Sequence, residues 1–517
     1  MRAVVASGPT GGEKRRAAAL WHLARQGSRR LGWGVADQGM SSITNFAVSI
    51  YIARTVGAVQ YGAFALAYVT YSFALNASRG LATDPLLVRF SGSDVTRWRS
   101  AVANCTGTAI WVGVVTAAGV LASAALLGGT ARSAFLALGL TLPGLLLQDS
   151  WRFAFFAVGR GGQAFLNDSI WAAVLLPALA LLRTTGHANV FWFVLAWGSA
   201  ATVAAAAGPL QARVVPRVSG ARQWTSQNRD LGPRYLAEGT ANSAQSQLRI
   251  YAIGLVLGLA AVGYVQAAST LMGPFMVIFF GMGLVGLPEA VRLLARSSRH
   301  LVTFCTLFGV GLAATAFLWG TVLLVALPRG LGQWVLGSLW RPTYPLVLPL
   351  TISVMGGCVA ASAGMGLHAL GAARRSLRAM LVSSASYLVF GVVGALGGGV
   401  LGSVIGVAVA GWSGAVVFWW HLRSALVESG HLPAARRLFS NHRMAPARGG
   451  PPAETPPADE PPAGQSPTDR PRVDEPPAVP ELVDGVPEPV DGPRIRIARG
   501  HSYQRAGGLA RRPDLEG

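Results

Sequence analysis

The sequence predicts an all-α polytopic membrane protein, with about 12 transmembrane helices in two six-helix parallel repeats around a central cavity. Three observations predict this fold: long apolar stretches fill roughly the first 420 residues, arginine is concentrated in every second connection, and short motifs recur along the chain. A helix needs about 20 apolar residues to cross ~30 Å of hydrocarbon. Segments 111–128, 191–209 and 379–397 approach that length without a charged residue.

The composition excludes a soluble globule, because 52% of residues are hydrophobic and only 13% are charged. The formal charge of +21 does not indicate a nucleic-acid partner. The basic residues lie in short connections, where they set the topology of a membrane protein.

The N-terminal segment is basic and precedes the first apolar stretch, without the pattern of a cleaved signal peptide. Placing it in the cytoplasm puts the arginine-rich connections there too, so we expect a multi-pass protein of the cytoplasmic (cell) membrane with both termini cytoplasmic. The expected parts are a basic N-terminal segment (1–32), the first six-helix bundle (33–211), a basic linker (212–234), the second bundle (235–424) and a tail (425–517).

The tail differs from the rest of the chain. Residues beyond 430 carry 12 of the 22 acidic residues, are rich in proline and lack apolar periodicity. This composition predicts a disordered cytoplasmic segment.

Four motif matches indicate an internal repeat. Gly57, Tyr61 and Gly62 correspond at an offset of 201 to Gly258, Val262 and Gly263, and the same offset relates Asp37 to Glu238. Two further matches join Val102, Cys105 and Thr106 to Val302, Cys305 and Thr306, and residues 157–160 to 369–372. An even number of helices in each half makes the repeats parallel.

The first block also carries a family resemblance. Trp33-Gly34, Asp37-Gln38, Ser41-Ser42, Asn45-Phe46, Ala53-Arg54, Gly57 and Tyr61-Gly62 resemble the opening of polysaccharide transporters. These are the O-antigen-type lipid-linked oligosaccharide flippases of the multidrug/oligosaccharidyl-lipid/polysaccharide (MOP) exporter superfamily. The resemblance spans residues 30–425 and departs from the family at 58–60. It implies two six-helix bundles, alternating access and export of a polyprenyl-diphosphate-linked glycan, with membrane lipids and glycan-assembly enzymes as further partners.

Such a substrate needs a wet, cationic path, so ionisable residues inside helices are the candidates for its site. Arg249, near the middle of the seventh helix beside Gln245, has no acidic residue one turn away. Its guanidinium either clamps phosphate oxygens or bonds to carbonyls or to an acid on another helix.

Two further arginines are candidates for the diphosphate. Arg79 in the second helix either serves this role or extends to the interface. Arg152 lies three residues after Asp149, a spacing that would also let the two neutralise each other on one helix face.

Asp37 and Glu238, at equivalent places near the cytoplasmic ends of the first and seventh helices, are candidates for ion coupling or for an inner gate with Arg249 or Arg79. The alternative is a helix N-terminal acid favoured by the macrodipole. Asn45 is grouped with them as a gating candidate. Asp84-Pro85 is expected to end a helix, and Asp168 to act as an N-cap.

No catalytic residue, metal site or cofactor is predicted, because the sequence lacks a phosphate-binding glycine loop, a catalytic triad and metal-ligand spacing. The three cysteines are expected to be packing residues. Two alternatives to a flippase remain: a multidrug or organic-cation antiporter of the same superfamily, and a non-transporting scaffold for glycan assembly.

Overall fold

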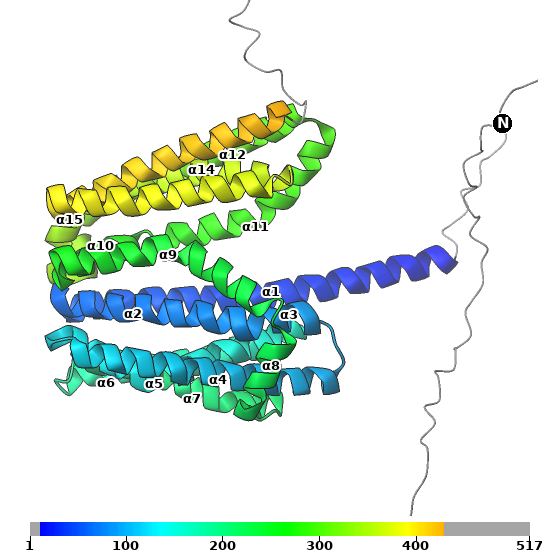
Figure 1. Cartoon of the computed structure of the whole chain (residues 1–517), viewed down its shortest axis with the longest axis horizontal. Coiled ribbons are helices and arrows are strands. Elements are labelled where there is room, and N and C mark those ends of the chain that lie inside the picture. Colours follow the sequence, from blue (N-terminus) through cyan, green and yellow to red (C-terminus); the bar gives the residue numbers. More distant parts are fainter. Residues whose placement is uncertain (1–10, 429–517) are drawn as a thin grey trace, which may run out of the picture. The chain divides into compact units, whose positions relative to one another are not determined.

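The computed structural model describes residues 11–428, with side chains described from residue 32 onward except at 241–242, 280, 284–285 and 329. The expectations about the tail and about the N-terminal basic side chains therefore lie outside the described residues. Over the described range the chain is helical and contains no strand. Figure 1 shows the membrane-crossing helices running alongside one another.

The first half contains six crossing segments. They are formed by α1 (Gly11–Thr55), α2 (Ala58–Ser78) continued through the π-helical turn η1 (Arg79–Thr83) into α3 (Asp84–Phe90), α4 (Val95–Leu126), α5 (Gly129–Ala157), α6 (Gly161–Thr184) and α7 (Val190–Ala212). The connection that follows includes a 3-10 turn (Val218–Gly220) and the short helix α8 (Ala221–Gln227). We call the side of the helices that carries α8 the linker side, and the opposite side the far side.

The second half repeats this order. Its crossing segments are α9 (Gly232–Leu257), α10 (Leu259–Leu271) with α11 (Gly273–Arg296), α12 (Ser298–Ala326), α14 (Trp340–Ala369) and the two arms of α15 (Ala373–Glu428), with α13 (Leu331–Leu336) flanked by 3-10 turns (Leu327–Arg329 and Gly337–Leu339). The arms of α15 are separated at Gly398 and Gly399, and Gly399 has a φ of +61°. Only glycine adopts that backbone conformation readily, so the chain reverses there.

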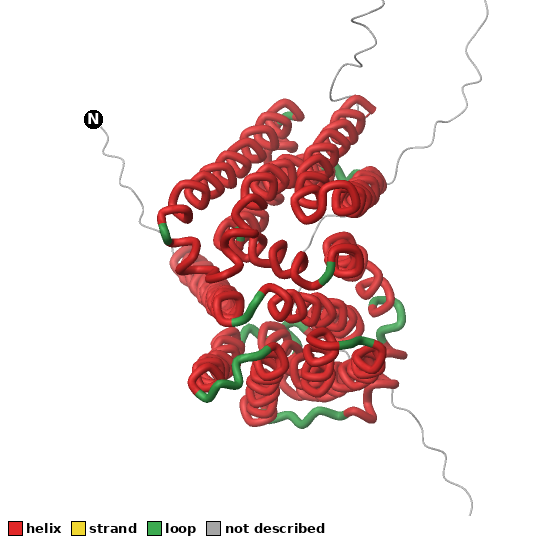
Figure 2. Tube along the Cα trace, turned by 90° about the vertical axis from the view of Figure 1, so that its left-hand side faces the viewer, coloured by secondary structure: helices red, strands yellow, loops and turns green. Residues whose placement is uncertain are grey.

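Eight of the described helices are long and apolar enough to cross a membrane, and α15 among them is folded into two arms. The crossing segments in α1, α2 and α9 fall outside that set. In α9, polar and charged residues lower the hydropathy of the helix; these include Glu238, Gln245, Gln247 and Arg249. Both ends of the described chain lie on the linker side, since each half crosses an even number of times (Figure 2 views the helices and their short loops end-on).

The two-repeat prediction is confirmed, and the matched motifs have the same local structure. Gly57 and Gly258 are the N-caps of α2 and α10, the second crossing segments of their halves. Gly159 and Gly371 both have positive φ values, +69° and +66°, and end α5 and α14. In each case the next residue's N–H bonds to a carbonyl five residues back, from Arg160 to Phe155 and from Ala372 to Leu367.

Two local expectations are wrong. Asp84-Pro85 does not end a helix: the chain passes through η1 and continues as α3, with proline in its first turn. The Leu81 carbonyl, four residues before Pro85, accepts a hydrogen bond from the Trp224 indole instead. Asp168 is not an N-cap, because α6 begins at Gly161 and Asp168 lies two turns inside it.

The linker is fastened to the first half. Trp224 of α8 is buried, stacks on Phe90 and donates its indole N–H to the Leu81 carbonyl at 3.2 Å. Arg89 donates to both carboxylate oxygens of Asp230, at 2.8 and 2.6 Å. The backbone N–H of Asp230 itself and the Arg89 guanidinium lower the pKa of the Asp230 carboxyl. The connection between the halves is therefore anchored at the end of α3.

Candidate functional site

The first half contains a buried charge network. Arg79, the first residue of η1, donates two hydrogen bonds to Asp149 of α5, from Nε at 2.9 Å and from Nη2 at 2.7 Å. Its guanidinium also lies 4.9 Å from the centre of the Phe153 ring. This bidentate pair neutralises Arg79 inside the helix bundle.

Arg152 is the second cation of the network and is paired with different acids from those expected. Its Nη2 and Nε lie 2.5 and 2.6 Å from Oδ2 of Asp37 in α1. Its Nε is 3.6 Å from Asp168 in α6, whose carboxylate also accepts a 2.7 Å bond from Gln148. The expected neutralisation of Arg152 by Asp149 is wrong, because Asp149 turns to Arg79.

The network contains more acid than base. Three buried carboxyl groups, from Asp37, Asp149 and Asp168, face two guanidinium groups. Oδ1 of Asp37 has no hydrogen-bond partner. In a low-dielectric interior an excess carboxylate is costly, so the network favours taking up a proton or another cation.

Arg249 in α9 presents the opposite electrostatics. It is 4% exposed, and neither Nε nor Nη1 has a hydrogen-bond partner. Its guanidinium lies 5.2 Å from the centre of the Tyr387 ring on the first arm of α15. A Cβ built on Gly391 of the same arm would lie 2.7 Å from Cδ of Arg249, so glycine makes room for the arginine stem.

No described carboxylate neutralises Arg249 within the second half. The acidic residues of that half in the described range lie near the linker-side ends of their helices, at Glu238, Glu289 and Glu428. Glu289 pairs with Arg292 and Glu428 with Arg375. The second half therefore carries an unneutralised buried cation, while the first half carries an excess of acid.

The other predicted residues occupy varied surroundings. Glu238 is exposed on α9, whereas Asp37, at the matching place of the repeat, is buried. Asn45 donates to the Ser41 carbonyl of its own helix at 2.9 Å. Gln245 is half-buried, while its neighbour Gln247 is buried with an unpartnered Oε1. Neither Asp37 nor Glu238 pairs with Arg249 or Arg79.

Four residues contribute to these surroundings without a signal in the sequence. Tyr387 and Gly391 lie in an uncharged stretch that gives no signal of contact with α9. Gln148 and Asp168 join the network through a helix pairing that spacing along one helix does not report.

The two seams between the halves differ on the linker side. Along one seam η1 touches α9: a Cβ on Gly80 would lie 2.5 Å from the Leu236 backbone nitrogen, and Asn76 donates to Ser243 at 2.9 Å. At the repeat offset, the counterparts of Gly80 and Leu236 are Gly281 and Val35. A Cβ on Gly281 would meet no atom within 4 Å, and Val35 is 70% exposed.

At the second seam, a close approach of described residues lies toward the far side. A Cβ on Gly273 would lie 3.3 Å from the Phe46 ring, near the break between α10 and α11. Beyond this point Figure 1 shows α11 running away from α1 toward the linker side. Both helices expose apolar side chains along this stretch, including Ile43, Ile278 and Met282.

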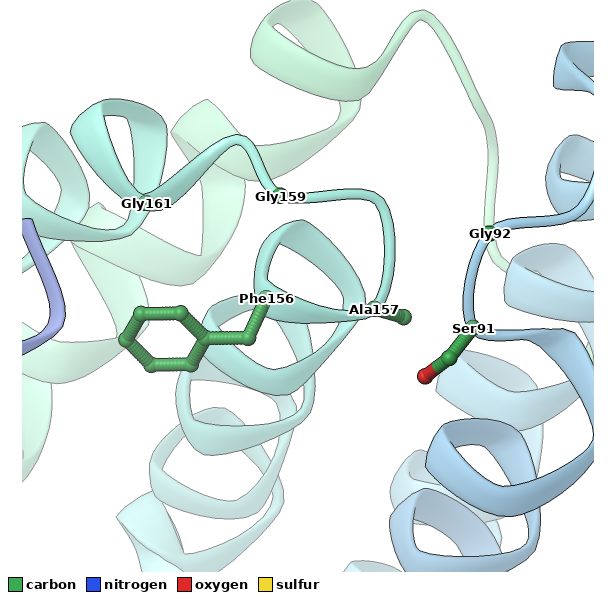
Figure 3. A pocket seen from close by; sticks show the side chains of 6 residues that line it. All are labelled: Ser91, Gly92, Phe156, Ala157, Gly159 and Gly161. Atoms are coloured by element: carbon green, nitrogen blue, oxygen red, sulfur yellow. The ribbon is translucent and has the colours of Figure 1, made fainter. Parts of the chain in front are cut away.

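A cavity of about 380 Å³ lies elsewhere, on the linker side of the first half (Figure 3). It lies between the turn after α3 and the turn after α5, and is lined by Ser91, Gly92, Phe156, Ala157, Gly159 and Gly161. None of the predicted site residues lines it.

Solved structures with the same arrangement of helices are transporters. A multidrug resistance MATE family transporter of the MOP superfamily, in an inward-facing conformation, matches with a TM-score of 0.58 at 13% identity, covering 76% of this chain and 96% of that one. The chain has the fold of MOP superfamily transporters.

Two further structures agree with this assignment. The lipid II flippase MurJ, in an inward closed conformation, matches with a TM-score of 0.57 at 12% identity, over 76% of this chain and 87% of that one. The eukaryotic MATE transporter AtDTX14 matches with a TM-score of 0.50 at 14% identity, over 78% and 98%. No protein-family model and no curated protein sequence matches the chain.

Proposed function

We propose that this chain is a flippase that exports a polyprenyl-diphosphate-linked oligosaccharide or polysaccharide precursor across the cytoplasmic membrane by alternating access. In this proposal the linker side is cytoplasmic, because arginines are concentrated there, and both termini are cytoplasmic. Membrane lipids surround the protein, and glycan-assembly enzymes supply and receive the substrate.

The observation that carries the proposal is Arg249, a buried guanidinium with two unpartnered nitrogens and no neighbouring acid. An unpaired charge inside a membrane protein is expensive and is retained where it has a function. A diphosphate supplies the missing negative charge and oxygens for a bidentate contact. We therefore assign Arg249 to the diphosphate and regard Arg79 and Arg152, which are already paired with acids, as secondary candidates.

The divergence of α1 and α11 supports a lipid substrate. Apolar side chains are exposed on both helices where they separate. An opening at this seam would leave the polyprenyl chain in the bilayer while the charged headgroup enters between the halves. A soluble substrate has no need of such a seam.

The excess carboxylate in the first half supports coupling to a proton. We propose that the Asp37 and Asp168 carboxyls around Arg152 share a proton, and that its binding and release bias the rocking of the halves. Glu238, which is exposed, is not part of this site.

A second candidate, an antiporter of multidrug or organic-cation type, is favoured by the same excess of acid, since carboxylates bind cations as well as protons. The two functions differ in what Arg249 does. A cation substrate is repelled by an unneutralised guanidinium, whereas a diphosphate is attracted by it. A scaffold role would instead depend on the tail, and deletion of residues 431–517 would abolish it.

The test uses purified protein in liposomes and two substrates. A fluorescent polyprenyl-diphosphate oligosaccharide should become accessible to an impermeant quencher only when protein is present. Arg249→Ala should abolish this movement, and Arg183→Ala, which removes an exposed arginine at the end of α6, should preserve it. Movement of an organic cation against a proton gradient, without movement of the lipid, would overturn the flippase assignment in favour of the antiporter.

A further inference from the structure

The two halves meet on the far side at a crossing of α2 with α10. A Cβ built on Gly62 would lie 1.8 Å from the carbonyl oxygen of Leu259, and one built on Gly263 would lie 2.4 Å from the carbonyl oxygen of Ala58. Any side chain at either position collides with backbone, which cannot swing aside. This approach of the helices therefore requires glycine at both positions.

The crossing has the symmetry of the repeat. The offset that relates the halves, 201 residues, carries Ala58 onto Leu259 and Gly62 onto Gly263. Gly62 contacts Leu259, and Gly263 contacts Ala58, so the repeat carries one contact onto the other. An isologous contact between identical subunits has the same pattern. Such a contact lies on the axis that relates the two halves.

A cluster of hydroxyl groups lies close to the crossing and joins the same halves. The oxygens of Ser49 in α1 and Tyr61 in α2 are 2.7 Å apart, and the oxygen of Thr270 in α10 lies 3.1 Å from Ser49 and 3.2 Å from Tyr61. Tyr61 is fully buried. Bonds between neutral hydroxyls exchange with water at small net cost, so this cluster fastens the halves reversibly.

We propose that the Gly62–Gly263 crossing is the far-side gate of the transporter, held closed here, and that the Ser49–Tyr61–Thr270 cluster is its fastening. At the crossing the two backbones are in direct contact, and the buried side chains of Tyr61 and Val262 pack beside them. Bulk at either glycine prevents closure and leaves the gate open. The proposal concerns the halves themselves and does not depend on which substrate is carried.

Pulsed electron spin resonance on the full chain in lipid nanodiscs tests the gate without any substrate. Spin labels placed at Thr185→Cys and Gln333→Cys, exposed positions at the far side of the two halves, report their separation. The native cysteines are buried, which favours labelling of the introduced ones. We expect one dominant short distance in the parent chain, and a shift of population to longer distances in both Gly62→Ala and Gly263→Ala.

Gly119→Ala in α4 is the matched control, since a Cβ there would meet no atom within 4 Å. It should leave the distances unchanged. Tyr61→Phe keeps the buried ring but removes the fastening hydroxyl, so it should move population in the same direction to a smaller extent.

A distance distribution identical to that of the parent chain in Gly263→Ala and Tyr61→Phe would overturn the gate assignment, even if Gly62→Ala does not fold. Because these measurements contain no glycan and no ion gradient, their failure is separable from failure of the proposed function. A flippase whose gate lies elsewhere would still move its lipid in the liposome assay.

Discussion

Two arginines illustrate how the same residue type acquires different roles in one molecule. Arg152 has the Asp37 carboxylate 2.5 Å away and a second carboxylate at 3.6 Å. Arg249 has an aromatic ring beside it and two nitrogens without a partner. The first arginine contributes to structure through its ion pairs, whereas the second is a buried charge that the fold leaves available.

Replacing each arginine by methionine should affect stability differently. Arg152→Met strands two buried carboxyl groups and should lower the free energy of unfolding by about 3–5 kcal/mol. Arg249→Met removes an unpaired buried charge and should leave that free energy unchanged or raise it by about 1–4 kcal/mol. Equilibrium unfolding in detergent measures both, and a loss of several kcal/mol in Arg249→Met would mean that Arg249 is paired within the protein.

The proposed coupling to a proton can be tested at a single residue. Asp168→Asn removes the third carboxyl and leaves one acid for each guanidinium in the first half. We expect transport by this variant to lose its dependence on a pH gradient while the protein still folds. Uptake by liposomes with and without the gradient measures this, with Glu289→Gln as the control. Retention of the parent chain's pH-gradient dependence would exclude Asp168 as the proton site.

Among the elements, the sequence predicted that crossing helices are present. It did not predict where individual helices begin, end or change their winding. Long uncharged apolar stretches predict crossing helices because the hydrocarbon leaves few alternatives for the backbone. The π-helical turn after Ser78 did not follow from the sequence, since proline at position 85 indicates a helix end unless its missing N–H falls in a first turn. Asp168 was predicted to be an N-cap because an aspartate can cap a helix. The type of side chain alone does not distinguish a helix end from a pairing with Arg152 on α5.

The linker helix α8 is an element whose contribution can be measured. Trp224→Ala should destabilise the protein by about 3–5 kcal/mol, because a buried indole ring is lost. Trp224→Phe retains an aromatic ring against Phe90 but loses the hydrogen bond to the Leu81 carbonyl. It should lower the free energy of unfolding by about 1 kcal/mol. Thermal unfolding compares both with Trp420→Ala, whose side chain is 63% exposed. Equal melting temperatures for Trp224→Ala and Trp420→Ala would show that the linker is not anchored by this residue.

In the whole molecule, the repeat determines the arrangement of the helices. The candidate site depends on residues that differ between the two halves. The matched glycines at 57 and 258 and at 159 and 371 have equivalent places, so spacing along the sequence predicted the two halves. Asp37 and Glu238 share the same offset but differ in burial. Which arginines are paired depends on contacts between helices far apart in the chain, and periodicity within one helix carries no information on these.

The two seams between the halves also differ, although the repeat relates their residues. The seam at Gly80 and Leu236 is closed while its counterpart at Gly281 and Val35 is open. The two seams therefore differ on the linker side, and the close crossing of Gly62 and Gly263 lies on the far side.

Arg249 is proposed to bind the diphosphate of a lipid-linked glycan. The most direct test of this proposal is the dissociation constant of a short-chain polyprenyl diphosphate for purified protein, measured by calorimetry for the parent chain, Arg249→Gln and the exposed-site control Arg183→Gln. Loss of a charge-assisted contact of about 1.5–3 kcal/mol should weaken binding roughly 10- to 150-fold in Arg249→Gln and leave Arg183→Gln unchanged. Equal dissociation constants for the parent chain and Arg249→Gln would contradict the account.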